Sequence, residues 1–179
     1  MPRIDPVSIE NAPEESKPVM EKIHAAFGKV PNIFATLANS PAALKSLMGM
    51  FGALGEGALA GKAHEAIALR IGEIHGCRYC TAAHTAKAKM AGATDDEALN
   101  YRKGTSDDPK IQALLKLAES MVANRGQHSD EDLAAAKAAG INEAELLETV
   151  AIVACNTFTN YINALVQTEV DFPPAPEIG

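Results

Sequence analysis

The chain has 179 residues, of which 47% are hydrophobic but only 4% aromatic, and its formal net charge is −7. The length fits one domain, and without tryptophan the core must be packed mainly by Ala, Leu, Ile and Val. The acidic balance argues against nucleic acid or an anionic membrane surface as the main partner, because both need a basic face on the protein.

The ends of the chain differ in composition from the segment between them. Residues 1–13 predict an extended, proline-rich N-terminal arm, residues 14–172 a single all-helical domain, and residues 173–179 a C-terminal tail. The segment Met1–Pro6 carries charges and two prolines where a secretory signal has an apolar core, and no run of about 18 apolar residues is present. We therefore expect a cytoplasmic protein with no membrane partner.

The first half of the chain shows the apolar spacing of helices in succession. A helix over 14–27 ends at Gly28, a short one opens at 30–34 and is interrupted at Ser40–Pro41, and a third covers 42–54. Three glycines between 55 and 61 predict a flexible joint. Two further helices are expected over 62–74 and 77–90.

Helix start signals are clearer in the second half. Each of three pairs resembles a capping box or its aspartate variant, and a fourth start places a capping aspartate before proline: Thr94 with Glu97, Ser129 with Asp132, Asn142 with Glu145, and Asp108 with Pro109. The last helix, expected over 143–170, is apolar on most sides, which predicts burial at the domain centre or in a subunit contact. No convincing strand alternation is present, so the sequence predicts an all-α fold: a compact multi-helix domain.

Two of the three cysteines form a C-x-x-C pair, Cys77 and Cys80, followed four residues later by His84. These offsets place both sulfurs and the imidazole on one face of a helix that begins at the cysteines. A cysteine at a helix N-terminus has a lowered thiol pKa, and a neighbouring imidazole can accept its proton. One sulfur can also resolve a sulfenic acid formed on the other by closing a disulfide. The pattern therefore favours thiol redox chemistry.

Other interpretations of the pair remain open at this level. A thioredoxin fold needs a βαβ pattern, which is absent. Cys77, Cys80 and His84 could bind a metal with His75, Glu65 or Cys155 as fourth ligand, but a structural zinc site commonly has a second ligand pair downstream, so we predict no metal. An inert buried pair is the third interpretation.

The longer pattern Glu65-x11-Cys77-x-x-Cys80-x3-His84, between alanine-rich helices, is much more specific. It resembles the core motif of the alkyl hydroperoxidase D and carboxymuconolactone decarboxylase superfamily, particularly its peroxidase-related branch. The resemblance covers roughly residues 40–165, and the segments 30–32, 160–163 and 169–173 also resemble that branch. It implies a core of helical hairpins that assembles into trimers or hexamers.

The resemblance also implies residue roles. Cys80 matches the family's peroxide-attacking cysteine, Cys77 its resolving cysteine, and Glu65 and His84 its proton relay. Tyr79 stands where the best-known alkyl hydroperoxidase has a further histidine, and it is a poor proton acceptor at neutral pH. Tyr79 and His75 are therefore auxiliary candidates only. The resemblance implies no bound cofactor, and electrons that come from an external dithiol or lipoyl-type reductant delivered by a thiol reductant protein.

These observations predict a thiol-dependent peroxidase that reduces organic hydroperoxides or hydrogen peroxide. The alternatives are a carboxymuconolactone decarboxylase-like enzyme without redox change, which would not need both thiols, and a non-catalytic thiol redox sensor. The remaining histidines are expected at the surface, and Cys155, in an apolar run, is expected in the core. Met48, Met50, Phe51 and Leu54 are expected in the core or a subunit interface.

Overall fold

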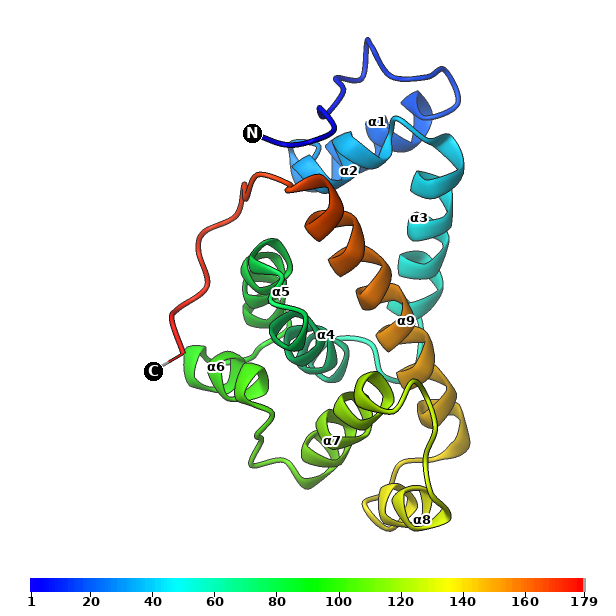
Figure 1. Ribbon diagram of the computed structural model, residues 1–179, viewed down its shortest axis with the longest axis vertical. Coiled ribbons are helices and arrows are strands. Elements are labelled where there is room, and N and C mark those ends of the chain that lie inside the picture. The colour runs from blue at the N-terminus through cyan, green and yellow to red at the C-terminus, as the bar shows by residue number, and fades with distance from the viewer. Residues whose placement is uncertain (179) are drawn as a thin grey trace.

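The computed structural model describes residues 1–178, and these residues form nine α-helices and no β-strand (Figure 1). In chain order the helices are α1 Lys17–Phe27, α2 Asn32–Leu37, α3 Pro41–Gly55, α4 Lys62–Ile74, α5 Arg78–Met90, α6 Asp95–Lys103, α7 Pro109–Ala123, α8 Asp130–Ala138 and α9 Glu143–Val166. The all-α prediction is confirmed. Gly179, the last residue of the predicted tail, lies outside the described residues.

The predicted helix starts in the second half are confirmed by their hydrogen bonds. Complete capping boxes begin α6, α8 and α9, in which the Ncap side chain accepts the N–H of the third helical residue and that residue's carboxylate accepts the Ncap N–H. Asp108 accepts two N–H groups at the start of α7, with Pro109 as the first helical residue. These contacts satisfy backbone donors that the first turn of a helix leaves free.

The predicted end of the last helix is wrong. We expected it near residue 170, but α9 ends at Val166 because Gln167 adopts the left-handed conformation, with φ of 59° and ψ of 50°, and donates its N–H to the Asn163 carbonyl. The chain can therefore turn back after α9. At the end of α1, by contrast, Gly28 is left-handed with φ of 72°, where the sequence predicted a stop.

Helix α4 lies at the centre of the bundle and packs against α5, α6, α7 and α9. Its residues Ala66–Leu69 are fully buried, and the small alanine side chains let neighbouring helices approach closely. Only three residues separate α4 from α5, so the two helices form a hairpin. This hairpin carries all four residues of the predicted motif.

Helix α9 is buried on one face only. That face packs against α3, α4, α5 and α7, whereas Leu147, Val150, Tyr161 and Leu165 are exposed on the other. Within residues 1–178, α9 alone has the length and hydropathy of a membrane span, a property that core helices of soluble proteins share. The centre of the domain is thus α4, and α9 is its half-buried neighbour.

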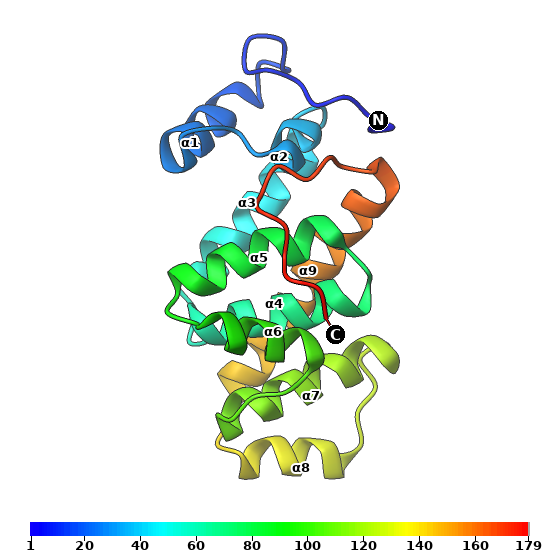
Figure 2. The ribbon, with the colours of Figure 1, turned by 90° about the vertical axis from the view of Figure 1, so that its left-hand side faces the viewer.

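The C-terminal segment after α9 returns along the molecule and crosses α5 (Figure 2). Asn32 Nδ2 donates to the Glu169 carbonyl at 3.0 Å, and Arg102 donates to the carbonyl of Pro176. The N-terminal arm is tied down as well, since the Arg3 N–H bonds the Val166 carbonyl at 2.6 Å. Helices α1 and α2 lie at one end of the elongated bundle and α8 at the other (Figure 1).

Candidate active site

Cys77 and Cys80 lie where α5 begins. Gly76, with φ of +63°, makes the left-handed turn between α4 and α5, a conformation that only glycine adopts without strain. Cys77 is the Ncap residue, its sulfur accepts the Cys80 N–H at 3.2 Å, and the two sulfurs are joined in a disulfide with their Cα atoms 5.3 Å apart. When reduced, a thiolate here meets free N–H groups and the positive end of the helix dipole.

Glu65 and His84 form a buried hydrogen-bonded pair across the hairpin. Glu65 Oε2 lies 2.7 Å from His84 Nδ1, and the two side chains are 13% and 7% exposed. Burial opposes ionisation of Glu65, but the charge and hydrogen bond of His84 outweigh it and hold the pKa of the carboxyl below its ordinary value. In a neutral ring the Nδ1–H donates to this carboxylate, which leaves Nε2 as the nitrogen that can accept a proton.

One side of the disulfide opens on a small apolar pocket. Its walls include Phe34, Phe51 and Phe172, and Cys80 and His84 line it as well. Its cavity volume of about 40 Å³ is enough for a small polar group such as a hydroperoxyl, because one water needs roughly 10–15 Å³ by the same measure. Phe51, predicted in the core or an interface, is a wall of this pocket.

The other side of the disulfide opens on a different, more polar hollow of about 340 Å³. Cys77 lines it together with His75, Arg78 and Gln167. The His75 ring lies edge-on to Tyr161, with 5.4 Å between centroids, and burial lowers its pKa. His75 therefore lines the Cys77 hollow and not the pocket that contains Cys80 and His84.

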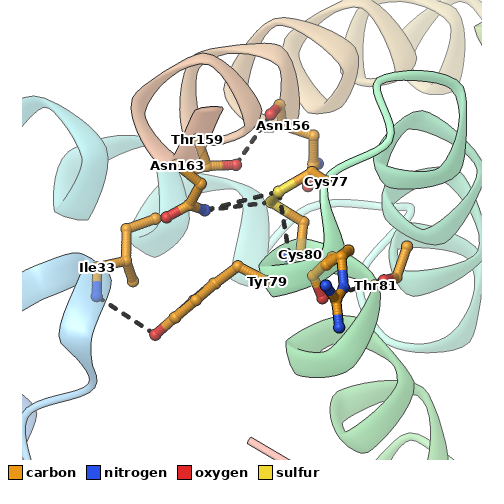
Figure 3. Close-up of a disulfide and its surroundings, with 9 residues drawn as sticks. Ile33, Cys77, Tyr79, Cys80, Thr81, Asn156, Thr159 and Asn163 are labelled. Carbon is orange, nitrogen blue, oxygen red and sulfur yellow. Dashed lines mark hydrogen bonds between the residues drawn. A yellow bond between two sulfur atoms is a disulfide. The ribbon is translucent and has the colours of Figure 1, made fainter. Parts of the chain in front are cut away.

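Asn163 on α9 points its side-chain amide at both sulfurs (Figure 3). Nδ2 lies 3.2 Å from Cys80 Sγ and 3.8 Å from Cys77 Sγ, and Asn163 is 6% exposed. An amide donor in a buried site stabilises a thiolate more than a thiol. The sequence prediction gave this residue no role, although it lies in the segment 160–163 that resembles the peroxidase-related branch.

Tyr79 points away from the disulfide (Figure 3). Its hydroxyl donates to Asp171 Oδ1 at 2.7 Å and accepts the Ile33 N–H at 3.3 Å. Burial and the Asp171 carboxylate raise the pKa of this phenol, so it does not accept protons near neutral pH. Tyr79 instead ties α5 to the C-terminal segment, which Lys29 also holds through Asp171 at 2.8 Å.

Two residues outside the motif are buried nearby. His64 is 8% exposed, contrary to its predicted surface position, and burial lowers its pKa. Cys155 is fully buried, in agreement with its predicted core position, and burial raises its pKa to about 11. In the described part of the chain, no three His, Cys, Asp or Glu side chains gather closely enough to hold a metal ion.

Comparison with known proteins matches the segment that carries this geometry to one family model. Residues 41–120 match the model of the carboxymuconolactone decarboxylase family, and this segment contains Glu65, Cys77, Cys80 and His84. No curated protein matches the chain in sequence. The resemblance predicted from the motif is confirmed over this segment.

Several solved structures share the fold. The alkylhydroperoxidase AhpD core of an uncharacterized peroxidase-related protein from Ralstonia eutropha JMP134 has a TM-score of 0.86 at 22% identity, over 95% of this chain and 92% of that one. A peroxidase-related protein from Silicibacter sp. TM1040 has a TM-score of 0.78 at 22% identity, over 89% and 86%. The debrominase Bmp8, in a C82A form bound to 2,3,4-tribromopyrrole, has a TM-score of 0.77 at 21% identity, over 94% and 91%. The fold therefore hosts more than one chemistry.

Proposed function

We propose that this chain, with its carboxymuconolactone decarboxylase family segment, is a thiol-dependent peroxidase. It reduces organic hydroperoxides or hydrogen peroxide through a cycle of the Cys77–Cys80 dithiol and disulfide. One observation carries the proposal: Cys80 lines an apolar pocket beside His84, which is held by Glu65, while Cys77 closes a disulfide with Cys80 across one helical turn.

The first step oxidises Cys80. His84 Nε2 takes the thiol proton, and the Asn163 amide and the start of α5 stabilise the thiolate. The thiolate attacks the terminal peroxide oxygen, an S–O bond forms and the O–O bond breaks. The leaving alkoxide takes the proton back from His84, so the products are an alcohol, or water from hydrogen peroxide, and a sulfenic acid on Cys80. The sulfur loses the two electrons that the peroxide gains.

The second step closes the disulfide. The Cys77 thiol, as its thiolate, attacks the Cys80 sulfur and displaces hydroxide, which leaves as water with the thiol proton. With the disulfide closed, the Cα atoms lie 5.3 Å apart, within the usual range for disulfides, and the start of α5 is still helical. This step needs no reactant other than the two cysteines.

The third step returns the electrons. An external dithiol or lipoyl-type reductant, carried by a reductant protein, attacks Cys77 from the polar hollow and releases the Cys80 thiolate toward Asn163. The second thiol of the reductant then displaces Cys77, so the reductant leaves as its own disulfide. The two sulfurs line different hollows, which supports separate approaches for oxidant and reductant.

We also propose that the chain works as a homo-oligomer, a trimer or hexamer. The exposed apolar residues of α9 support this, because a face carrying Leu147, Val150, Tyr161 and Leu165 is suited to a subunit contact. Sedimentation of the wild type and of Leu165→Asp tests it: the wild type sediments as an oligomer and the variant as a smaller species. A monomeric wild type contradicts the proposal.

Peroxide consumption by the reduced protein with a dithiol reductant tests the peroxidase function. Wild type and Cys155→Ser turn over repeatedly, Cys80→Ser is inactive, and Cys77→Ser stops after one oxidation with a sulfenic acid that dimedone traps. If wild type oxidises only once in excess reductant, the protein is a sensor. If Cys80→Ser matches wild type, the chemistry does not run through the disulfide pair and a non-redox activity gains support.

A further inference from the structure

Lys87 is a half-buried cation in the lining of the Cys80 pocket. It lies on α5, three residues after His84 and seven after Cys80, so that all three side chains share one face of the helix. Its Nζ lies 4.9 Å from the centre of the Phe51 ring. Lys87 therefore stands on the same pocket as the reactive sulfur, two helical turns away from it.

The ammonium of Lys87 has no anionic partner within residues 1–178, since it makes neither an ion pair nor a hydrogen bond. Lys29, the other cation beside an aromatic residue of the pocket, is neutralised by Asp171 at 2.8 Å. The nearby carboxylate of Glu65 is engaged by His84 at 2.7 Å. The positive charge of Lys87 is therefore available to a ligand bound in the pocket.

The remaining pocket lining offers this charge nothing to pair with. Phenylalanines, Pro31, Ile33 and Ala83 supply most of the surface, and no aspartate or glutamate lines the pocket. A partly desolvated ammonium loses hydration that Phe51 only partly replaces, so an anion brought by a ligand gains a strong interaction there. Lys87 also lowers the pKa of Glu65, in keeping with its position close to the reactive groups.

We propose that Lys87 selects hydroperoxides that carry a carboxylate on an apolar body, with the carboxylate at Lys87 and the hydroperoxyl group at Cys80. This inference rests on the proposed peroxidase function and names its substrate class. Seven residues of helix separate the two anchors by roughly 10 Å along the axis, and Phe51 lines the same pocket as both of them. Substrates with an apolar spacer of that order satisfy both ends of the pocket.

If Lys87 acts only by stabilising the negative charge of Glu65, the substrate dependence of its loss is different. That role slows the reaction with every peroxide alike, because the relay acts on the O–O bond and not on the rest of the substrate. The specificity role slows only the reaction with charged substrates. Two matched substrates separate the roles: cumene hydroperoxide and the same molecule with a para-carboxylate.

The experiment measures kcat/KM for both peroxides with wild type, Lys87→Met, Lys87→Arg and the control Lys116→Met, which removes a lysine from α7. Wild type and the control prefer the carboxylated peroxide by roughly 10- to 100-fold, Lys87→Arg keeps the preference, and Lys87→Met loses it because its rate falls much further with the carboxylated peroxide than with cumene hydroperoxide. Equal losses with both peroxides in Lys87→Met, or no preference in wild type, overturn the inference.

Binding to the disulfide form keeps the two proposals apart. We expect 4-isopropylbenzoate to bind the wild type more tightly than 4-isopropylbenzamide does, and Lys87→Met to abolish the difference. If this holds but neither peroxide is reduced, the peroxidase function fails and the anion site stands. If both peroxides are reduced but the two ligands bind alike, the peroxidase function stands and the Lys87 inference fails.

Discussion

Replacing Glu65 with glutamine removes the charge from the His84 pair and keeps nearly the same shape. The Oε2–Nδ1 distance is 2.7 Å and the side chains are only 13% and 7% exposed, so water compensates little of the loss. A hydrogen bond to a charged group contributes about 1.5–3 kcal/mol, and each 1.36 kcal/mol is a factor of ten in rate. We therefore expect Glu65→Gln to slow the oxidation of Cys80 by roughly 10- to 150-fold.

A single-turnover assay isolates this step. Reduced protein is mixed with cumene hydroperoxide and quenched in acid, and the remaining thiols are counted after alkylation by mass spectrometry. Glu119→Gln is the matched control, because it breaks an ion pair with Arg70 of 2.8 Å and lines neither of the two hollows at the disulfide. The control oxidises at the wild-type rate.

The reasoning is refuted if folded Glu65→Gln oxidises as fast as wild type. In that case the carboxylate does not prepare His84 to accept the thiol proton, and the pair is only structural. If the Glu119→Gln control slows as much as Glu65→Gln, the reasoning is refuted as well, because the loss then follows from removing any buried or surface carboxylate pair.

Three further predictions concern residues around the site. Cys155→Ser places a hydroxyl in a fully buried apolar position, so we expect urea denaturation to show an unfolding free energy lower by about 1–3 kcal/mol. Turnover stays within twofold of wild type, and a loss of turnover contradicts the assignment of Cys155 to the core. Burial lowers the pKa of His64, so as the pH falls the unfolded chain binds the proton before the folded chain does. The contribution of His64 to the unfolding free energy is therefore fully present above about pH 6.5 and falls as the pH drops below that value. Urea denaturation between pH 7.5 and 5 shows a smaller decline in His64→Gln, and equal declines contradict the reasoning. Tyr79→Phe removes the hydroxyl that bonds Asp171, costs about 1 kcal/mol and speeds amide hydrogen exchange in residues 168–178; unchanged exchange shows that the hydroxyl does not hold this segment.

Helix starts were predictable because capping is local. Asn142 and the Glu145 N–H that it caps are three residues apart, so the signal and its structural result lie in one short segment. The end of α9 was not predictable by the same means. Gln167 takes a left-handed conformation usually left to glycine, and the chain after it is held by distant contacts such as that of Asn32 with Glu169.

The site divides in the same way. The spacing of Cys77, Cys80 and His84 along one helix was enough to place them together, whereas Glu65 entered through the resemblance of the longer motif. Asn163 reaches the sulfurs only because α9 crosses the start of α5, a packing relation that no local pattern encodes. For the same reason the burial of His64 in the α4 hairpin was missed.

The position of Tyr79 has a consequence for proton transfer. Its hydroxyl is used to hold Asp171, whose neighbour Phe172 forms part of the pocket wall, so the residue between the cysteines helps to shape the pocket and does not relay protons. Of the side chains that line this pocket, the imidazole of His84 is the one suited to general acid–base catalysis in the proposed cycle. The same ring must then deprotonate the thiol and protonate the alkoxide. Because one ring has both roles, the proposed cycle depends most on the hydrogen bond from this ring to the Glu65 carboxylate, which fixes the orientation and the tautomer of the ring.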